Sequence, residues 1–543
     1  MMAPVRLFLK EGANVRRMDE HIFVLNGRGR SVLPCCNISG GAGRRNIPLA
    51  GRVFAAELYI CKITPLKAIV NLNLIMTMHK INLYPLRITP ALMTVFLLSG
   101  IALSSCDTRQ SALRNRQKQV IQEVNASEIP IGNKPIAIIG ALVVDGNGGA
   151  PLENGCVIVS DGKISAMGIT GEIKIPDGAE VVDAQGMTLL PGFIDAHFHL
   201  DRVKDLPAKF LQHGVTSLRD PGAWIEAYDE ERRSGRQMPR LFLSGPHLDM
   251  FPPAYPNDAY IVRDATEASR QVHRMIDSGA TVIKIYFRLP PDIIRAICEA
   301  AHSRGIPVTG HLETTEAMEA IEAGLDGIEH ITSFGLSLIP QREGEKYRRA
   351  VLADNNARKQ GRYEVWKSVD PDGPMADSLA RFLVKKGTFV TPTLGPFEYR
   401  LPQPIKNGDT AALHQFESDK QEPDSARWMG FNRMKALTAK LRKSGVAIVV
   451  GSHSMIPYAE EGWAYQRELE LLVESGLSNA EAIVAATMEN ARFFGVADKL
   501  GSINEGKIAD LVLLKGNPLI NISDARNIER VMLNGAWVPA DPR

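Results

Sequence analysis

Residues 190–494 contain eight short apolar segments, and a stretch with helical periodicity follows each of them. The segments read GFIDAHFH, GVTSLRD, RLFLSG, TVIKIYF, GIPVTGH, LDGIEH, GTFVTP and VAIVVGSH. Eight strand–helix units can close into a (β/α)8 barrel of the TIM type, and the number eight argues against the alternative, a doubly wound sheet. The alternation therefore predicts an α/β fold with a TIM-type barrel over residues 190–494.

Strand-rich segments flank the predicted barrel on both sides. Residues 134–189 and 495–543 alternate apolar runs with Gly, Asn and Asp turns, and neither segment is long enough to bury a sheet alone. We expect the two segments to pair into one small β-sandwich. Two insertions, at about 334–375 and 395–425, interrupt the repeat after the sixth and seventh strands, where barrel loops shape substrate pockets.

The first 133 residues differ in character from the rest. Residues 1–75 carry eleven Lys and Arg against four Asp and Glu and lack a sustained strand or helix period, so we expect an over-extended start outside the fold. Residues 76–105 combine a short basic region, a sixteen-residue apolar stretch and small residues before Cys106, the layout of a secretory signal. A membrane anchor beginning at Met1 is the alternative. The polar residues 106–133 are predicted to form a tether.

Charge and cysteine content narrow the function classes further. Residues 106–543 carry 50 Lys and Arg and 57 Asp and Glu, a mildly acidic balance that gives no indication of nucleic-acid binding. Of the six cysteines, only Cys156 and Cys298 lie in the predicted folded region, so a disulfide framework is not expected. The sequence predicts no particular oligomeric state.

Histidines stand at the predicted carboxyl ends of several barrel strands. His197 and His199 end the first strand, His311 ends the fifth and His330 ends the sixth. Residues two apart on a strand share a face, so His197 and His199 are placed to hold one metal ion, with two ordinary surface histidines as the alternative. His311 or His330 taken singly is more typical of a hydrogen-bonded rim histidine. Their joint position at the edge where barrel active sites lie predicts a metal site.

Lys284 lies in the predicted fourth strand, where it shares a face with Tyr286 and is expected to point into the barrel. Burial lowers the pKa of a lysine and makes the amine nucleophilic, and a neutral amine can take up CO2 as a carbamate that bridges two cations. The alternative is a buried ion pair with a barrel carboxylate such as Glu329. Tyr286 is a candidate donor to a developing oxyanion, with plain packing as its alternative.

These motifs together resemble the metal-dependent amidohydrolase superfamily, most closely its imidazolonepropionase-like and prolidase-like branch. The resemblance rests on PGFIDAHFHL, the strand-four lysine, VTGH, IEH and the tail AATMENARFFG…KLGSINEGKIADLVLL, and it covers about residues 134–543. It implies one or two divalent metal ions, of which zinc is the first expectation. In such a site His197 and His199 hold one ion, His311 and His330 hold a second, and a carbamylated Lys284 bridges them. It also implies a β-sandwich assembled from both chain ends.

The segment LSSC, which ends at Cys106, resembles the lipobox of bacterial lipoproteins. This resemblance implies lipid attachment to Cys106 after cleavage and a place at the bacterial cell envelope, facing the periplasm or the exterior. Contact with the membrane is then expected only through the lipid anchor.

Strand eight departs from the pattern of the superfamily. It reads VVGSHSM, and His453 stands where the superfamily has an aspartate that touches the metal and takes a proton from the bridging water. Three interpretations stay open: His453 is both ligand and catalytic base, Glu313 serves as the base, or the site binds metal and hydrolyses little.

The resemblance implies a hydrolase that cleaves a carbon–nitrogen bond through a metal-activated water, acting on a small amide, cyclic amide or dipeptide. One alternative is a catalytically weakened metal-binding or ligand-binding lipoprotein, which His453 favours. A lactone or phosphoester hydrolase on the same fold is a further alternative, because one activated water serves several electrophiles.

Overall fold

The computed structural model describes residues 14–18, 21–25, 121–201, 203–400 and 424–540. The chain divides into two compact units, Met1–Thr89 and Pro90–Arg543. In the first unit, β1 (Asn14–Met18) and β2 (His21–Leu25) pair as an antiparallel hairpin, where the sequence shows no sustained strand period. The predicted signal segment 76–105 and Cys106 lie outside the described residues. The over-extended start, the signal segment and the lipid site therefore stay predictions.

The predicted tether over 106–133 is described from Ile121 onward, and this last part packs on the second unit. Ile121 is 1% exposed, and its N–H donates to the Phe494 carbonyl. The Asn125 side chain donates to the carbonyl of Pro239 and accepts from the N–H of Leu241. Any free tether therefore ends before Ile121, because the apolar residues that follow have a core in which to bury.

Both ends of the second unit meet in one mixed sheet of eight strands. Its order is β20-β19-β18-β7-β3-β4-β5, with β6 paired to β3, and β18 runs antiparallel to β7. The pairing of residues 134–189 with residues 495–543 is thus confirmed, whereas their packing as a sandwich stays a prediction. The strands are β3 (Ile136–Val143), β4 (Leu152–Ser160), β5 (Lys163–Ile169), β6 (Glu180–Asp183), β7 (Met187–Pro191), β18 (Leu511–Lys515), β19 (Ile528–Leu533) and β20 (Ala536–Trp537).

Eight parallel strands of the middle region lie within the eight predicted apolar segments. They are β8 (Phe193–Asp195), β9 (Val215–Asp220), β10 (Arg240–Leu243), β13 (Ile283–Ile285), β14 (Val308–Gly310), β15 (Gly327–Glu329), β16 (Phe389–Thr391) and β17 (Ala447–Ile448). β8 to β10 form one sheet, and β13 to β17 form a second sheet together with two short strands that the sequence did not predict, β11 (His247–Asp249) and β12 (Ala259–Ile261).

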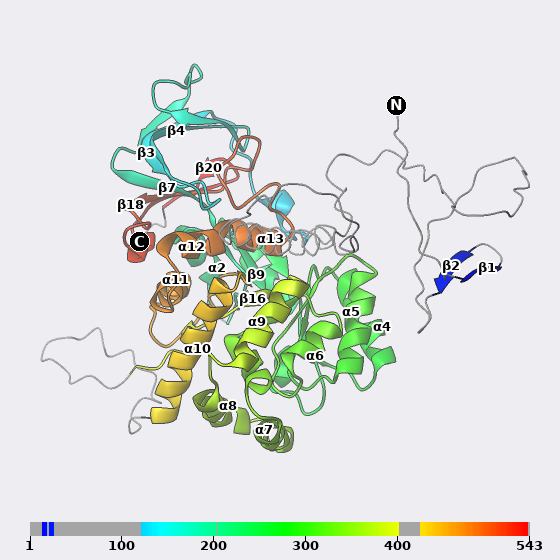
Figure 1. Ribbon diagram of the computed structural model, residues 1–543. Helices are drawn as coiled ribbons and strands as arrows, with labels where there is room; N and C mark the ends of the chain where they lie inside the picture. The colour runs from blue at the N-terminus through cyan, green and yellow to red at the C-terminus, as the bar shows by residue number, and fades with distance from the viewer. Residues whose placement is uncertain (1–13, 19–20, 26–120, 202, 401–423, 541–543) are drawn as a thin grey trace, which may run out of the picture. The chain divides into compact units, whose positions relative to one another are not determined.

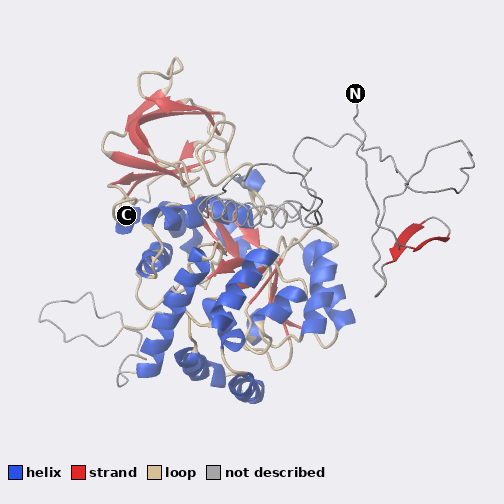
Figure 2. Ribbon diagram, viewed as in Figure 1, coloured by secondary structure: helices blue, strands red, loops and turns tan. Residues whose placement is uncertain are grey.

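Helices surround these strands, as Figures 1 and 2 show, and the arrangement is a TIM-barrel-like α/β fold. Backbone hydrogen bonds join the edges of the two sheets: the N–H of Thr281 donates to the Leu243 carbonyl, and the N–H of Ala196 donates to the Val450 carbonyl. The helices are α2 (Leu206–Gln212), α3 (Asp229–Arg233), α4 (Ala265–Asp277), α5 (Pro291–His302), α6 (Ala317–Glu322), α7 (Gln341–Ala353), α8 (Ala357–Ser368), α9 (Pro374–Lys386), α10 (Ser425–Lys443), α11 (Ala464–Glu474), α12 (Asn479–Val484) and α13 (Asn490–Phe493).

Helix α4 illustrates how the sequence determines where a helix begins, which face it buries and where it ends. Asp264 is the N-cap, and its side chain accepts a hydrogen bond from the N–H of Glu267, which satisfies a backbone donor that the first turn leaves free. Ala268, Val272 and Met275 recur at helical spacing and are buried, so one face of the helix packs on the strands. The helix ends before Gly279, which adopts φ +102°.

The two insertions lie beyond β15 and β16. The first supplies the 3-10 helix η5 (Ile331–Leu338) with α7 and α8, and it is anchored by Trp366, a fully buried side chain. The second begins with the short 3-10 helix η6 (Gly395–Phe397), and its residues 401–423 lie outside the described part of the chain. Both insertions follow strand ends, so they contribute to the face where the predicted site lies.

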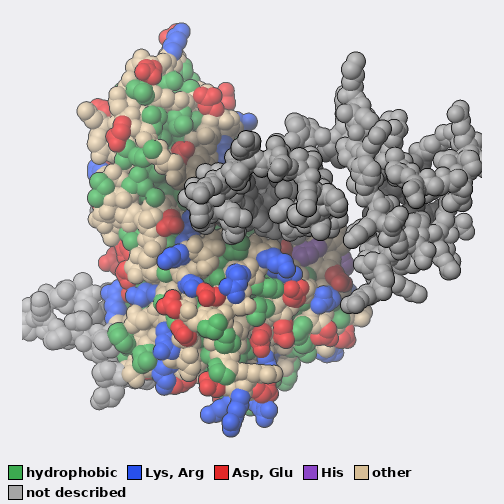
Figure 3. Space-filling view, in the orientation of Figure 1, with side chains coloured by type: hydrophobic (Ala, Val, Ile, Leu, Met, Phe, Trp, Pro, Cys, Tyr) green, Lys and Arg blue, Asp and Glu red, His purple; other side chains and the backbone are tan. Residues whose placement is uncertain are grey.

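Acidic and basic side chains alternate over the face that Figure 3 presents, without a large area of one sign. Cys156 and Cys298 are buried free thiols. Within the described ranges, no helix combines the length and the apolar character that crossing a membrane requires.

Candidate metal centre

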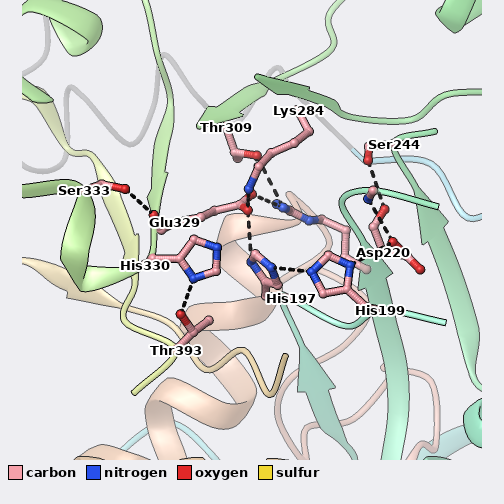
Figure 4. A network of polar contacts seen from close by, with 12 residues as sticks. His197, His199, Asp220, Ser244, Lys284, Thr309, Glu329, His330, Ser333 and Thr393 are labelled. Carbon is pink, nitrogen blue, oxygen red and sulfur yellow. Dashed lines mark hydrogen bonds and ion pairs between the residues drawn. The ribbon is translucent and has the colours of Figure 1, made fainter. Parts of the chain in front are cut away.

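The ends of the barrel strands bring five predicted histidines into one cluster. His197 and His199 follow β8, His311 follows β14, His330 follows β15, and His453 lies beyond β17. All five line a single cavity. Their ring centroids are 4.9 Å apart for His197–His199, 4.6 Å for His197–His330, 4.4 Å for His311–His330 and 4.7 Å for His199–His453. Figure 4 shows three of them facing one another.

The spacing of their nitrogens suits a shared cation. The Nε2 atoms of His197 and His199 are 3.0 Å apart, close to the roughly 3.3 Å between two histidine ligands of one tetrahedral zinc ion. One ring nitrogen each from His197, His330 and His453 lie within 4.8 Å of one another. This group differs from the predicted pairs, because it joins strands one, six and eight and leaves His311 at its side.

The imidazoles are neutral and available as ligands. Burial, followed by the positive charge of Lys284, lowers the pKa of His199 to about 3. Burial likewise lowers the pKa of His311 to about 3 and holds that of His453 well below the usual value. The Nδ1 atoms of His311 and His453 are buried without a hydrogen-bond partner among the described residues. Unpaired nitrogens in a buried cluster fit a metal site, since leaving them unpaired is otherwise costly.

Glu329 ties the strand-four lysine to the cluster (Figure 4). Its buried carboxylate forms ion pairs with Lys284 and Arg219, accepts a hydrogen bond from the Thr309 hydroxyl and lies 2.9 Å from Nδ1 of His197. Lys284 points inward, as predicted, and is 3% exposed. Burial lowers the pKa of Lys284 well below the usual value, and Arg219 lowers it further. The structure therefore contains the buried ion pair that was the alternative to a carbamate.

Strand eight is locked against strand one by backbone contacts. The Asp195 carboxylate accepts from the N–H groups of His197 and Ser452, both at 3.0 Å, and the N–H of His453 donates to the His197 carbonyl at 2.7 Å. A Cβ atom on Gly451 would lie 2.5 Å from Cβ of His197, so only glycine allows this approach. His453 adopts φ +60°, which turns it toward the other imidazoles.

Glu313, the alternative catalytic base, is engaged elsewhere. Its carboxylate accepts from Arg362 and from the Tyr347 hydroxyl, both at 2.5 Å, and lies 3.2 Å from Nε2 of His311. Burial alone would raise its pKa, but Arg362 and His311 outweigh burial and lower it to about 2. Glu313 is not among the residues that line the cavity. It positions His311 and Arg362 and has little capacity to take a proton.

Two residues that the sequence analysis missed complete the cluster. His247, in the unpredicted strand β11, is buried, and its ring centroid lies 4.4 Å from that of Tyr286, whose ring lies 4.7 Å from His311. Asp220 ends β9, and its Oδ1 lies 3.8 Å from Nδ1 of His199. The rule that singled out the histidines, a polar residue at a strand's carboxyl end, would have found Asp220.

The cavity in front of these histidines has a volume of about 1350 Å³, which admits a small molecule. The first insertion supplies Arg358, Arg362 and Tyr363 from α8 to its wall, and the second supplies Phe397. The site thus unites a buried nitrogen-rich centre with a roomy pocket that the inserted helices shape.

Comparison with protein families matches residues 188–538 to the amidohydrolase family. Among curated proteins, an N-acyl-D-aspartate deacylase from Alcaligenes xylosoxydans xylosoxydans is 44% identical over 64 residues, which cover 12% of each chain. An adenine deaminase from Moorella thermoacetica is 22% identical over 399 residues, covering 71% of this chain and 54% of the deaminase. The chain thus spans only a part of these curated relatives.

A solved structure of a candidate prolidase from Bifidobacterium longum is similar over most of the fold. It is 25% identical, the match covers 76% of this chain and 96% of the prolidase chain, and the TM-score is 0.57. The likeness indicates a common architecture over the matched part of the two chains.

Proposed function

This chain belongs to the amidohydrolase family, and on that premise we propose that it is a metal-dependent hydrolase of a carbon–nitrogen bond in a small amide, cyclic amide or dipeptide. The similar deacylase, deaminase and candidate prolidase carry names that refer to reactions at such bonds. The single observation that carries the proposal is the cluster of neutral imidazoles with unpaired nitrogens at the floor of a pocket.

His197, His199 and His330 are the residues that would hold the first metal ion, and His311 stands beside His330 for a second. Zinc is the metal that we propose, because imidazole nitrogens in a tetrahedral set are typical of it. Such an ion, when bound, lowers the pKa of water and polarises a carbonyl group.

His453 is the proposed proton carrier. A neutral imidazole has a single basic nitrogen, so His453 serves as a base in a state in which that nitrogen is not bound to the metal. Nδ1 of His453 has no hydrogen-bond partner in the part of the chain that is described. As the base, His453 would take a proton from the attacking water and deliver it to the leaving nitrogen. Tyr286, whose pKa burial raises above the usual value, keeps its hydroxyl proton and is the proposed donor to the developing oxyanion.

Carbamylation of Lys284 belongs to the same proposal. The lowered pKa of the lysine favours the neutral amine that reacts with CO2, whereas Glu329 already supplies a negative charge beside it. Incubation with 13C-bicarbonate should give a carbamate resonance in the carbon NMR spectrum that Lys284→Met lacks. A spectrum without that resonance in the metal-loaded protein would show that Lys284 acts only as the partner of Glu329.

Closure of the barrel and the lipid anchor are also proposals. The two backbone hydrogen bonds between the sheet edges support one closed (β/α)8 barrel. The LSSC segment supports a lipid on Cys106 and a place at the bacterial cell envelope. Labelled palmitate should enter the wild-type chain expressed in a bacterium and fail to enter Cys106→Ala.

Metal analysis tests the central claim. Purified protein should contain a divalent metal that His197→Ala and His330→Ala lose, while the control His273→Ala, on the outer helix α4, keeps it. The metal-loaded protein should hydrolyse members of a panel of N-acyl amino acids, cyclic amides and dipeptides. Wild-type protein that neither contains nor takes up a divalent metal would refute the proposal.

A catalytically weakened metal-binding protein is the second candidate function, and His453 in place of the family's aspartate is the observation that favours it. Assays of the wild type, His453→Asp and His453→Ala separate the two, and a latent enzyme should gain activity from His453→Asp. If the wild type is a binding protein, this variant binds metal and stays inactive. If the wild type is an enzyme, it hydrolyses the panel before any substitution, and His453→Ala lowers the rate by about 10²- to 10⁴-fold, the contribution of a positioned base.

A further inference from the structure

Three arginines line the cavity, Arg358, Arg362 and Arg427, and two of them pair with carboxylates. The Nε atom of Arg427 lies 3.5 Å from the Asp424 carboxylate. Arg362 donates to the Glu313 carboxylate at 2.5 Å. Both of these arginines therefore already have partners within the protein.

Arg358 differs from both. It lies in α8, is 6% exposed and lines the cavity. Its side chain forms a hydrogen bond with Tyr255 and its Nε is buried without a partner, but unlike Arg362 and Arg427 it forms no ion pair with a carboxylate of the described residues. A guanidinium stays charged at any physiological pH, so burial without a counterion carries a large desolvation cost. An anion that binds in the cavity would supply the missing counterion and offset this desolvation cost.

Aromatic rings connect Arg358 to the histidine cluster. Its guanidinium carbon lies 5.1 Å from the centre of the Tyr255 ring, Tyr255 lies 5.8 Å from Tyr286, and Tyr286 lies 4.7 Å from His311, ring centre to ring centre. Burial alone would raise the pKa of Tyr255, but Arg358 and Arg362 outweigh it and lower this pKa. The positive charges of α8 therefore act on the part of the pocket that Tyr255 and Tyr286 line, and the rings of these two tyrosines are apolar surfaces for a ligand.

We propose that Arg358 binds a carboxylate of the substrate, so that the hydrolysed molecule is an acidic amide such as an N-acyl amino acid or a dipeptide with a free carboxyl end. The inference rests on the proposed function for the reacting bond and adds the chemical class of the substrate. A guanidinium holds a carboxylate through two parallel hydrogen bonds, and the rings of Tyr255 and Tyr286 accommodate the apolar part next to it.

Other lining residues favour one orientation of the substrate. Glu230 and Glu231 of α3 line the same cavity. Their carboxylates repel an anion, so the acidic end of a substrate is favoured beside α8 and disfavoured beside α3.

Binding of a matched pair of probes tests the inference independently of catalysis. The probes are N-benzoylglycine and N-benzoylglycinamide, which differ only in the charge of the carboxyl end, and calorimetry measures their dissociation constants. Wild-type protein should bind the acid at least about 10-fold more tightly than the amide, the effect of a charge-assisted hydrogen bond. Arg358→Gln should abolish this preference, and Arg358→Lys should keep part of it.

Lys359→Gln is the matched control, because Lys359 lines the same cavity one residue along α8 but is exposed. It removes the same charge and should leave the preference unchanged. Equal affinities of the wild type for acid and amide, including no measurable binding of either, overturn the inference, as does a preference that survives in Arg358→Gln. Neither result bears on the proposed function, which is tested by metal analysis and by the hydrolysis panel, and these two tests do not depend on Arg358.

Discussion

Replacement of Glu329 by glutamine should destabilise the protein far more than loss of an ordinary surface carboxylate. The Glu329 carboxylate is the partner of Arg219 and Lys284, whose side chains are 0% and 3% exposed. Glutamine keeps the shape and removes the charge, so both cations lose their counterion inside the protein. Lys284 can give up its proton, since its pKa is already lowered, but Arg219 cannot escape in that way.

The expected loss of stability follows from the number of buried cations that lose their counterion. Removing one partner of a buried ion pair costs about 3–5 kcal/mol. A unit of about 400 residues loses about 0.8 kcal/mol of stability per degree near its midpoint, so the melting temperature should fall by about 4–6 °C. The melting temperatures of the wild type and of Glu329→Gln are both measured after metal removal with EDTA, because a difference in bound metal would otherwise add to the difference in melting temperature.

The control for this experiment is Glu322→Gln. Glu322 pairs with Lys386 at 2.9 Å, but its side chain is 56% exposed, and such a pair contributes less than about 1 kcal/mol. Adding Lys284→Met to Glu329→Gln should recover part of the loss, because it removes one of the two cations that lack a counterion. A melting temperature of Glu329→Gln within about 1 °C of the control would refute the reasoning that this carboxylate balances buried charge.

Three further changes have defined outcomes. Gly451→Ala should lower metal content and activity, since the added Cβ would lie 2.5 Å from Cβ of His197; unchanged metal content would contradict this. Burial raises the pKa of Asp249 to about 7, so the wild type should lose stability relative to Asp249→Asn as the pH rises from 5 to 8, and parallel melting curves would contradict it. Phe494→Ala should cost about 3–5 kcal/mol in urea unfolding, because its buried ring packs against Phe242 at 4.8 Å; a loss below about 1 kcal/mol would show that the site repacks.

Sequence reasoning found the strands because their signal is local. Each of the eight barrel strands is a short apolar run beside a helical period, and both patterns can be read within a few residues. It missed β11 and β12, since they consist of three residues each in a segment rich in Pro and Asp, where no period can develop. It also placed a free tether through residue 133, because the burial of Ile121 depends on contacts with Phe494, far along the chain.

The candidate site divides in the same way. His197, His199, His311 and His330 were found because residues that end parallel strands meet at one edge of a barrel, whatever the details of packing. The grouping of His453 with His197 and His330 required coordinates, since it depends on the close approach that Gly451 allows.

What the sequence by itself determined is therefore the alternation of elements, the edge at which the chemistry lies and the residue types available there. What only the tertiary structure decided is which charges are paired: Lys284 with Glu329, Glu313 with Arg362, and Arg358 with no carboxylate of the described residues. The physical reason is range. Strand and helix periods arise between near neighbours, whereas burial and ion pairing join residues from different strands and insertions, and no local pattern records those distances.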